Sequence, residues 1–261
     1  MRPPRTAASP DAAVRGGLPK KIMIEVNHLV KRFGPKVVLK NLDFHASQGE
    51  FVALLGPNGA GKTTFLRILS SLSRQTLGEV TIAGFSLPHQ AAAVRRQLGV
   101  VSHLPLLYGD LSAEENLSFY GRMYGVEHLG QRINEVLDLV GLVARRRDLV
   151  RTFSRGMQQR LAIGRAIMHD PEVLLLDEPH TGLDQDACEM LDDVLRQVTA
   201  RQRTVVMTSH DLVRVADLAS RFDVLSRGSI RASLPRQDLP QDGLLAFYRQ
   251  ALNAASQGGA A

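Results

Sequence analysis

No feature of this sequence limits its possible folds more than a glycine-rich segment at residues 56–64, which follows a short apolar run. The segment has the spacing G-x-x-x-x-G-K-[ST] of a phosphate-binding loop. Glycines let backbone N–H groups turn toward an anion, and a helix that starts at the end of the loop directs its positive dipole end there. The segment consists of Gly56, Pro57, Asn58, Gly59, Ala60, Gly61, Lys62, Thr63 and Thr64.

Three side chains of this loop have defined chemical tasks. We expect Lys62 to reach the β- and γ-phosphates, the Thr63 hydroxyl to ligate Mg²⁺, and Thr64 to hydrogen-bond the α-phosphate. A glycine-rich turn with a chance lysine is the alternative, but the flanking strand and helix patterns argue against it. The loop therefore predicts a nucleotide site without identifying the reaction.

A second motif is an apolar run that ends in two carboxylates. Residues 173–176 are aliphatic, as in parallel strands buried on both faces, and Asp177 and Glu178 follow them. Ligands of parallel sheets lie beyond the carboxyl ends of the strands. We expect Asp177 to hold Mg²⁺ and Glu178 to act as the general base that polarises the attacking water. An acidic pair that merely faces solvent is the alternative for this motif alone.

Strands that alternate with helices predict an α/β fold with a mainly parallel sheet. The strands of this sheet are expected at 50–55, 97–102, 173–176 and 204–208, with helices at 63–71 and 186–200. Residues 22–30 and 37–44 are predicted to be edge strands, 79–82 a short strand, and 222–226 with 229–233 a hairpin. Helices at 112–124, 127–140 and 154–169 predict a helical subdomain of about residues 105–165 inserted in the core.

Composition excludes several classes of protein. The chain has a net charge of +6 but only 5% aromatic residues, and no basic stripe is interleaved with aromatics, so we expect no nucleic-acid partner. A single cysteine, Cys188, excludes an intramolecular disulfide and fits a reducing compartment. No apolar run approaches the roughly 20 residues that span a bilayer. If the protein works at a membrane, we expect it to dock there through a partner.

Residues 153–160, which begin Phe-Ser-Arg-Gly-Met at the start of a predicted helix, resemble the signature of ABC (ATP-binding cassette) ATPases. The usual form is Leu-Ser-Gly-Gly-Gln, followed by Gln-Arg. The resemblance implies that Ser154 and Gly156 contact the γ-phosphate of an ATP bound by the opposite subunit of a head-to-tail dimer. An ordinary N-capped helix is the alternative for these residues alone. The departures from the usual form are Phe153, Arg155 and Met157.

Three further positions resemble motifs of the same family, in the same order. The segment 181–184 resembles the D-loop that crosses the dimer interface, which brings Asp184 to that interface. His210 resembles the switch histidine that touches the γ-phosphate and positions the water. Phe33 resembles the aromatic residue that stacks on adenine, although it could equally be a core residue.

The resemblance implies the fold of a P-loop NTPase of the ABC ATPase type. It has a mainly parallel sheet, an antiparallel β subdomain and an inserted helical subdomain. We expect a disordered basic arm at 1–20, the ATPase domain at 21–240, and a C-terminal helix with a flexible tail at 241–261. ATP and Mg²⁺ are the implied cofactors. The implied partners are a second cassette, expected to be a copy of this chain, and transmembrane permease subunits, which would hold the protein peripherally at the cytoplasmic face of the inner membrane.

One position departs from the family. Where many relatives have a glutamine that contacts Mg²⁺, this chain has His103, and an imidazole cannot replace an amide group for group. His103 is nevertheless a candidate metal contact. Together with residues 107–117 and 119–125, it resembles the ATPase of the haem exporter used in cytochrome c maturation. ATPases of drug, lipid and polysaccharide exporters share much of this stretch and are the alternative.

Two other classes are less compatible with the sequence. Soluble ABC ATPases of translation carry two cassettes, and those of DNA repair carry a long coiled coil between phosphate loop and signature, for which residues 65–152 are too few and lack heptads. A nucleotide-binding regulator that does not hydrolyse ATP would not need both Glu178 and His210.

Overall fold

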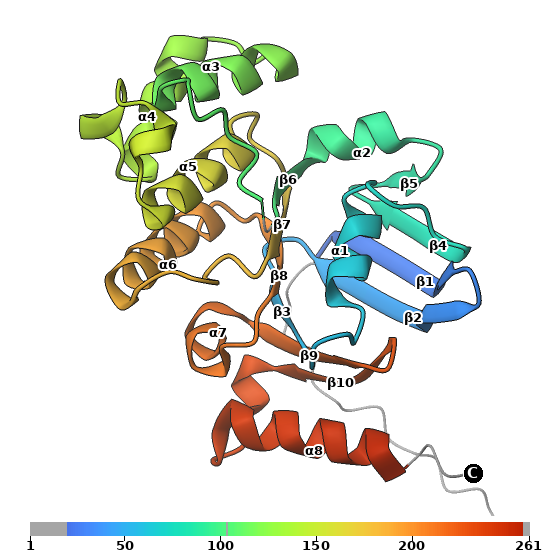
Figure 1. Cartoon of the computed structure of the whole chain (residues 1–261). Coiled ribbons are helices and arrows are strands. Elements are labelled where there is room, and N and C mark those ends of the chain that lie inside the picture. Colours follow the sequence, from blue (N-terminus) through green and yellow to red (C-terminus); the bar gives the residue numbers. More distant parts are fainter. Residues whose placement is uncertain (1–19, 103, 258–261) are drawn as a thin grey trace, which may run out of the picture.

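The computed structural model describes residues 20–102 and 104–257, which form two β-sheets with helices packed around them (Figure 1). One sheet is antiparallel, with the strand order β2-β1-β4-β5, and the other is mainly parallel, with the order β10-β9-β3-β8-β7-β6. The strands are β1 Ile22–Phe33, β2 Lys36–Ser47, β3 Phe51–Leu55, β4 Leu77–Ile82, β5 Phe85–Leu87, β6 Leu98–Val101, β7 Val173–Asp177, β8 Thr204–Thr208, β9 Arg221–Ser226 and β10 Ser229–Pro235.

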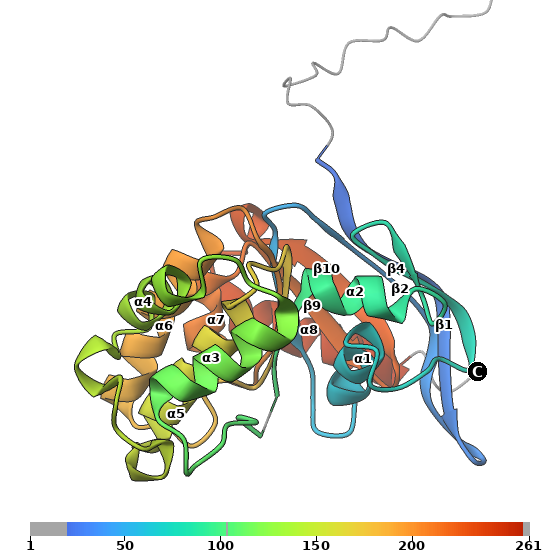
Figure 2. The ribbon, with the colours of Figure 1, turned by 90° about the horizontal axis from the view of Figure 1, so that it is seen from above.

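Two groups of helices separate clearly when the molecule is seen from above (Figure 2). Helices α1 and α2 lie near the antiparallel sheet, whereas α3, α4, α5 and α6 lie together on the opposite side. The helices are α1 Lys62–Leu69, α2 Ala91–Gln97, α3 Ala113–Tyr124, α4 Leu129–Leu139, α5 Arg155–Ile167, α6 Gln185–Thr199, α7 Leu212–Leu218 and α8 Gly243–Gln257, with 3₁₀ turns at Val143–Arg145, Val150–Thr152 and Arg236–Asp238.

Strand β3 is buried on both faces because it separates two hydrophobic cores. Ala53 and Leu55 point into the core formed with α5 and α6, and Val52 and Leu54 point into the core formed with α1 and the antiparallel sheet. Alternation along an extended strand sends successive side chains to opposite faces. Because both faces of β3, β7 and β8 are apolar, these three strands have polar side chains only at or beyond their ends, which is where the phosphate loop and the acidic pair lie.

The antiparallel sheet corrects one prediction from the sequence. Residues 22–30 were expected to form an edge strand, but β1 lies between β2 and β4 and pairs with both. Alternation of apolar and polar residues indicates that one face of a strand is packed against the core. It does not indicate whether the strand pairs with one neighbouring strand or with two. Strand β2 does lie at an edge of this sheet.

The sequence patterns also missed three short elements, namely β5, α2 and α7. Each is three to seven residues long, too short to show a clear hydrophobic period. By contrast, the capping box predicted at Ser112 is present, because its side chain accepts from the N–H of Glu115 and the Glu115 carboxylate accepts from the N–H of Ser112.

Within residues 20–102 and 104–257, no helix is long and apolar enough to cross a membrane. The predicted basic arm lies outside the described residues except for its last position, and so does the end of the predicted tail.

Candidate functional site

The phosphate loop joins β3 to α1, and close packing leaves little room for a Cβ atom at two of its glycines. Gly56 has φ +154°, and a Cβ atom there would lie 2.1 Å from the carbonyl oxygen of Leu225. Gly61 has φ +113°, and a Cβ atom there would lie 2.7 Å from a methyl group of Leu39. No described side chain caps α1, so the first N–H groups of this helix are available to an anion.

Lys62 lies beneath the loop with its ammonium group directed back at the loop's own backbone. Its Nζ donates to the carbonyl oxygens of Gly56 at 2.7 Å and Pro57 at 3.4 Å. Burial lowers the pKa of Lys62, and the nearby negative charges of Glu178 and Asp177 oppose that shift. The lysine is therefore a buried cation beside two carboxylates, suited to an anionic ligand that takes over from the carbonyl contacts.

The predicted magnesium ligands converge at the end of β7. Asp177 Oδ1 accepts a hydrogen bond from Thr208 Oγ1 at 2.7 Å and from Thr63 Oγ1 at 3.4 Å. A hydroxyl and a carboxylate oxygen are the ligand types that Mg²⁺ takes. The part of the chain that the structure describes has no group of three or more His, Cys, Asp or Glu side chains that could hold a metal.

Glu178 begins the loop after β7 in a backbone conformation that L-residues rarely adopt, with φ +49°. Its N–H donates to Thr208 Oγ1 at 3.0 Å. Its carboxylate Oε2 accepts from Thr181 Oγ1 at 3.2 Å and lies 3.4 Å from Nδ1 of His210. Strained backbone of this kind persists where surrounding contacts hold it, often at functional sites.

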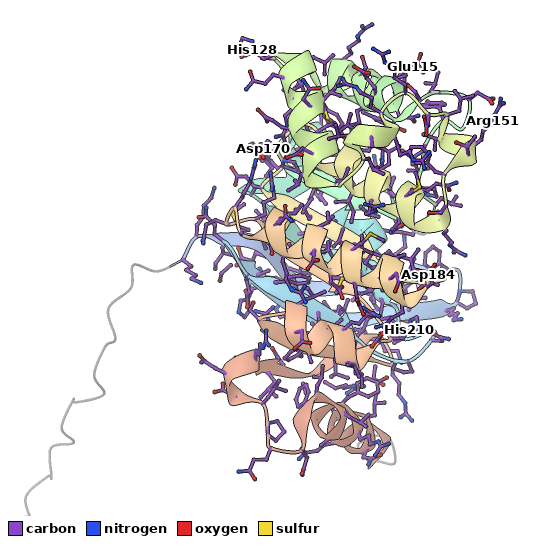
Figure 3. All side chains as sticks on the ribbon, turned by 90° about the vertical axis from the view of Figure 1, so that its left-hand side faces the viewer. Glu115, His128, Arg151, Asp170, Asp184 and His210 are labelled. Carbon is purple, nitrogen blue, oxygen red and sulfur yellow. The ribbon has the colours of Figure 1, made fainter. Side chains whose placement is uncertain are left out.

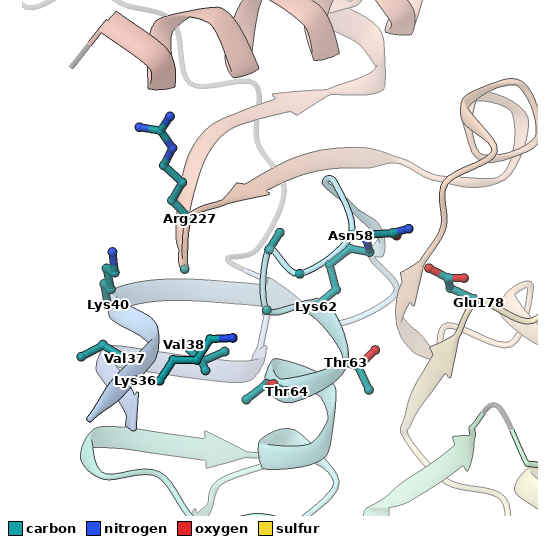
Figure 4. A pocket seen from close by; sticks show the side chains of 14 residues that line it. Lys36, Val37, Val38, Lys40, Asn58, Lys62, Thr63, Thr64, Glu178 and Arg227 are labelled. Atoms are coloured by element: carbon teal, nitrogen blue, oxygen red, sulfur yellow. The ribbon is translucent and has the colours of Figure 1, made fainter. Parts of the chain in front are cut away.

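A cavity of about 530 Å³ opens above the loop and extends from Glu178 to the tip of the β9–β10 hairpin (Figure 4). Residues 58–64 form its floor. Three basic residues that the sequence analysis did not single out, Lys36, Lys40 and Arg227, contribute to its walls. Nothing local in the sequence marks them, because they reach the cavity only when β2 and the hairpin pack against the loop.

Phe33 is not among the residues that line this cavity. It lies at the end of β1 with 52% of its surface exposed, and Nζ of Lys31 lies 4.6 Å from the centroid of its ring. Phe33 is the Cα partner of Lys36, which does line the cavity, and the stacking role of Phe33 stays a prediction.

The signature residues lie at the N-terminus of α5, away from the cavity above the phosphate loop. Ser154 caps this helix, with its Oγ accepting from the N–H of Met157 at 3.3 Å. Gly156 packs so closely on α6 that a Cβ atom would lie 2.7 Å from Cβ of Ala187. The guanidinium of Arg155 lies against Gly182 in the segment 181–184. The signature and the predicted D-loop thus form one continuous surface.

Asp184 and His210 border the same side of the molecule (Figure 3). Together with Glu178 they line a second cavity, of about 320 Å³. Asp184 caps α6 by accepting from the N–H of Ala187 at 2.8 Å. The one predicted site residue that cannot be placed is His103, which lies outside the described residues.

Comparisons of the sequence identify a family. The sequence profile of the family described as "ABC transporter" matches residues 39–181. The linearmycin resistance ATP-binding protein LnrL of Bacillus subtilis is 36% identical over 83% of this chain and 70% of its own length. The Nod factor export ATP-binding protein I of Paraburkholderia xenovorans is 36% identical over 78% of this chain and 68% of its own length.

Comparisons of the structure lead to the same family. An ATP-binding subunit of an ABC transporter superposes with a TM-score of 0.80 at 27% identity, over 88% of this chain and 99% of that one. A dimeric ATP-binding cassette in a post-hydrolysis state, with ADP and Pi, superposes with a TM-score of 0.73 at 27% identity, over 82% and 99% of the two chains. These matches confirm the predicted fold class.

Proposed function

This chain belongs to the ABC transporter family as an ATP-binding, ATP-hydrolysing subunit, and from that premise we propose that its ATP-driven dimerisation powers an exporter whose membrane permease is a separate chain. The proposal that this chain hydrolyses ATP at this site rests on one observation. Nδ1 of His210 lies 3.4 Å from Oε2 of Glu178, and Glu178 lines the cavity above the phosphate loop. Charge, helix dipole and a general base then surround one phosphate position.

Each side chain of the site has one task in this proposal. Lys62 and the N–H groups of α1 bind the β- and γ-phosphates, and Thr63 and Asp177 hold Mg²⁺, which neutralises charge on the phosphate oxygens when bound. The Glu178 carboxylate orients a water for in-line attack and receives its proton. His210 donates or accepts a hydrogen bond at the γ-phosphate and keeps Glu178 in place. Lys36, Lys40 and Arg227 add positive charge along the nucleotide cavity.

The dimeric part of the proposal rests on the position of the signature. Ser154 is exposed at the N-terminus of α5, Gly156 is buried against α6 in the first turn of α5, and neither residue lines the cavity above the chain's own phosphate loop. In a head-to-tail dimer this helix N-terminus would face the γ-phosphate bound by the other copy. The dimeric cassettes among the structural relatives support the same arrangement for this chain.

The permease would dock on the helical region formed by α3, α4 and α5, which we take as the helical subdomain. Residues before and along α3 expose several large apolar side chains, and exposed apolar surface of this kind marks a site of interaction with another protein. The exposed side chains there are Leu104, Leu106, Tyr108, Phe119 and Met123. Docking at this face places the chain peripherally at the cytoplasmic side of the membrane.

For the transported molecule, the named relatives favour an exporter of drug-like, lipid or polysaccharide compounds. One relative is named for linearmycin resistance and others for Nod factor export. Haem export is the second candidate. It rests on the resemblance of His103 and residues 107–125 to the haem exporter ATPase, and neither relative compared above is named for haem.

The variant Glu178→Gln tests the catalytic proposal, because it keeps the size of the side chain and removes the base. We expect turnover to fall by about 100-fold or more, while the affinity for ATP is kept and ATP shifts the protein to a dimer. Steady-state phosphate release and size-exclusion chromatography with ATP measure the two effects. Wild-type turnover in this variant would refute the assignment of the base.

A further inference from the structure

A network of buried charged side chains lies behind the loop that follows Glu178. Nε2 of His180 lies 2.7 Å from Asp192 Oδ1, and Nη1 of Arg214 donates to Asp192 Oδ2 at 3.0 Å. The exposed fractions of these three side chains are 8%, 9% and 14%. Arg214 also lies 3.3 Å from Asp211 Oδ2, through its Nε. The network therefore connects three elements: the loop at 178–184, α6 and the start of α7.

The hydrogen bonds of this network define its charges. Nδ1 of His180 is buried and has no hydrogen-bond partner among the described residues, so a proton there would be an unsatisfied buried donor. The proton of a neutral imidazole then lies on Nε2, which donates to Asp192. Burial alone would raise the pKa of Asp192, but His180 and Arg214 together hold it below its ordinary value. Asp192 is an ionised carboxylate shared between two donors.

Burial of this network is weak evidence that it serves to stabilise the fold. Buried ionic groups cost desolvation energy, and well-packed apolar residues of similar volume often stabilise a fold equally well or better. The position of the network beside Glu178 points to a different role.

Each end of the network is adjacent in sequence to a group that contacts Glu178. His180 precedes Thr181, whose hydroxyl donates to Glu178 Oε2 at 3.2 Å. At the other end, Asp211 follows His210, whose Nδ1 lies 3.4 Å from the same oxygen. Asp211 is itself fixed as the N-cap of α7. Thr181 and His210 thus flank a single oxygen of the proposed base, and one buried carboxylate, Asp192, is linked to the residues next to both of them.

We propose that His180 is a positioning residue for ATP hydrolysis, which works through Asp192 and Arg214 to hold Thr181 and His210 at the correct distance from Glu178. This inference rests on the proposed roles of Glu178 and His210. The imidazole of His180 is 8% exposed and directs its Nε2 at Asp192, so its effect on the site passes through Asp192. Its loss should therefore lower the rate of the chemical step and leave ATP binding unchanged.

The test compares two substitutions at the same position. His180→Leu keeps apolar bulk and removes the donor to Asp192, whereas His180→Gln places an amide donor at about the position of Nε2. We expect His180→Leu to lower kcat by about 10- to 100-fold, as for other misplaced catalytic groups, with KM for ATP and the affinity for a fluorescent ATP analogue within twofold of wild type. The glutamine variant should recover most of the lost kcat.

Matched controls separate positioning from general destabilisation. Asp193→Asn removes the neighbouring exposed ion pair of α6 with Arg196 and should leave kcat unchanged. Arg214→Lys keeps a charge but cannot bridge Asp192 and Asp211 together, and it should lower kcat in the same way if the leucine variant does not fold. A kcat within twofold of wild type in a folded His180→Leu or Arg214→Lys variant would overturn the proposal, as would equal losses in the leucine and glutamine variants. Glu178→Gln in the same series tests the base itself. Normal turnover in Glu178→Gln would refute the assignment of the base. Loss of turnover in Glu178→Gln together with normal turnover in His180→Leu would refute only the role of the network.

Discussion

Lys62 is almost fully buried, with 6% of its surface exposed, although lysine is among the residue types least often buried. Glu178 holds a left-handed backbone conformation without being glycine, and His180 leaves a ring nitrogen without a described partner. Each of these residues pays a local cost that packing alone does not explain. At the scale of single residues, Lys62 lies where the loop after β3 meets α1, and Glu178 and His180 lie in the loop after β7, so all three belong to the loops that form the proposed site.

His169 is a partly buried histidine outside these two loops, and its surroundings predict that the stability of the fold depends on pH. Its ring stacks on Tyr124 with centroids 3.8 Å apart, and Nε2 donates to the carbonyl oxygen of Leu98 at 3.1 Å. Burial lowers its pKa from 6.5 to about 4. Because the unfolded chain then binds a proton that the folded chain does not, the free energy of unfolding falls as pH drops from 6.5 toward 4, by at most about 1.4 kcal/mol per pH unit.

Replacing His169 with phenylalanine keeps a ring against Tyr124 and removes the titrating group. We expect the difference in unfolding free energy between pH 7 and pH 5, measured with urea, to be smaller in His169→Phe than in wild type by up to about 2 kcal/mol. His89→Gln is the control, since His89 is exposed and its loss should leave the difference unchanged. Equal differences in wild type and the phenylalanine variant would contradict the prediction.

At the scale of elements, the start of α3 is held by side-chain hydrogen bonds as well as by apolar packing. The capping box of Ser112 and Glu115 closes the first turn. Asn116 is fully buried, accepts from the N–H of Tyr108 at 2.8 Å, and donates to the carbonyl oxygen of Tyr108 at 3.0 Å and to that of Ser112 at 2.9 Å. The loop that precedes α3, which carries part of the proposed docking surface, is thereby fixed to the helix.

The change Asn116→Ala should destabilise this joint without affecting nucleotide binding. It leaves the N–H and carbonyl groups of Tyr108 without their side-chain partner, which we expect to cost about 2–3 kcal/mol of unfolding free energy. Urea unfolding measures the loss, and titration with a fluorescent ATP analogue checks that affinity is kept. Asn253→Ala, at an exposed position of α8, is the matched control. A loss below 0.5 kcal/mol, the range of ordinary surface changes, would show that the joint does not depend on Asn116.

At the scale of the whole molecule, one chain contains both parts of the proposed site, the phosphate loop and the signature, but these two parts are not in contact with each other. Residues 58–64 and Glu178 line one cavity, with Asp177 next to Thr63, and the signature lies at the N-terminal end of α5. A complete site in the proposed arrangement needs the loop of one copy and the signature of the other. Two-fold symmetry then produces two equal composite sites.

Mixing two inactive variants tests this arrangement. Lys62→Ala should lose nucleotide binding, and Ser154→Arg should block the surface that faces the partner's γ-phosphate, so each variant alone should be inactive. In an equal mixture half of the dimers are mixed, and each of these has one intact site, so turnover should return to about a quarter of the wild-type value. A mixture as inactive as its components would argue against a site shared between copies.

The sequence by itself determined the local chemistry of this protein: the phosphate loop, the apolar strand that ends in Asp177 and Glu178, the capping box and the order of most helices and strands. These features depend on backbone conformation and hydrophobic period, which act over a few neighbouring residues. Only the tertiary structure decided which of these segments meet. It brought His210 to Glu178, formed the His180–Asp192–Arg214 network from three elements, and added Lys36, Lys40 and Arg227 to the nucleotide cavity. Such contacts follow from how two cores pack on opposite faces of one sheet, and no short pattern records that packing.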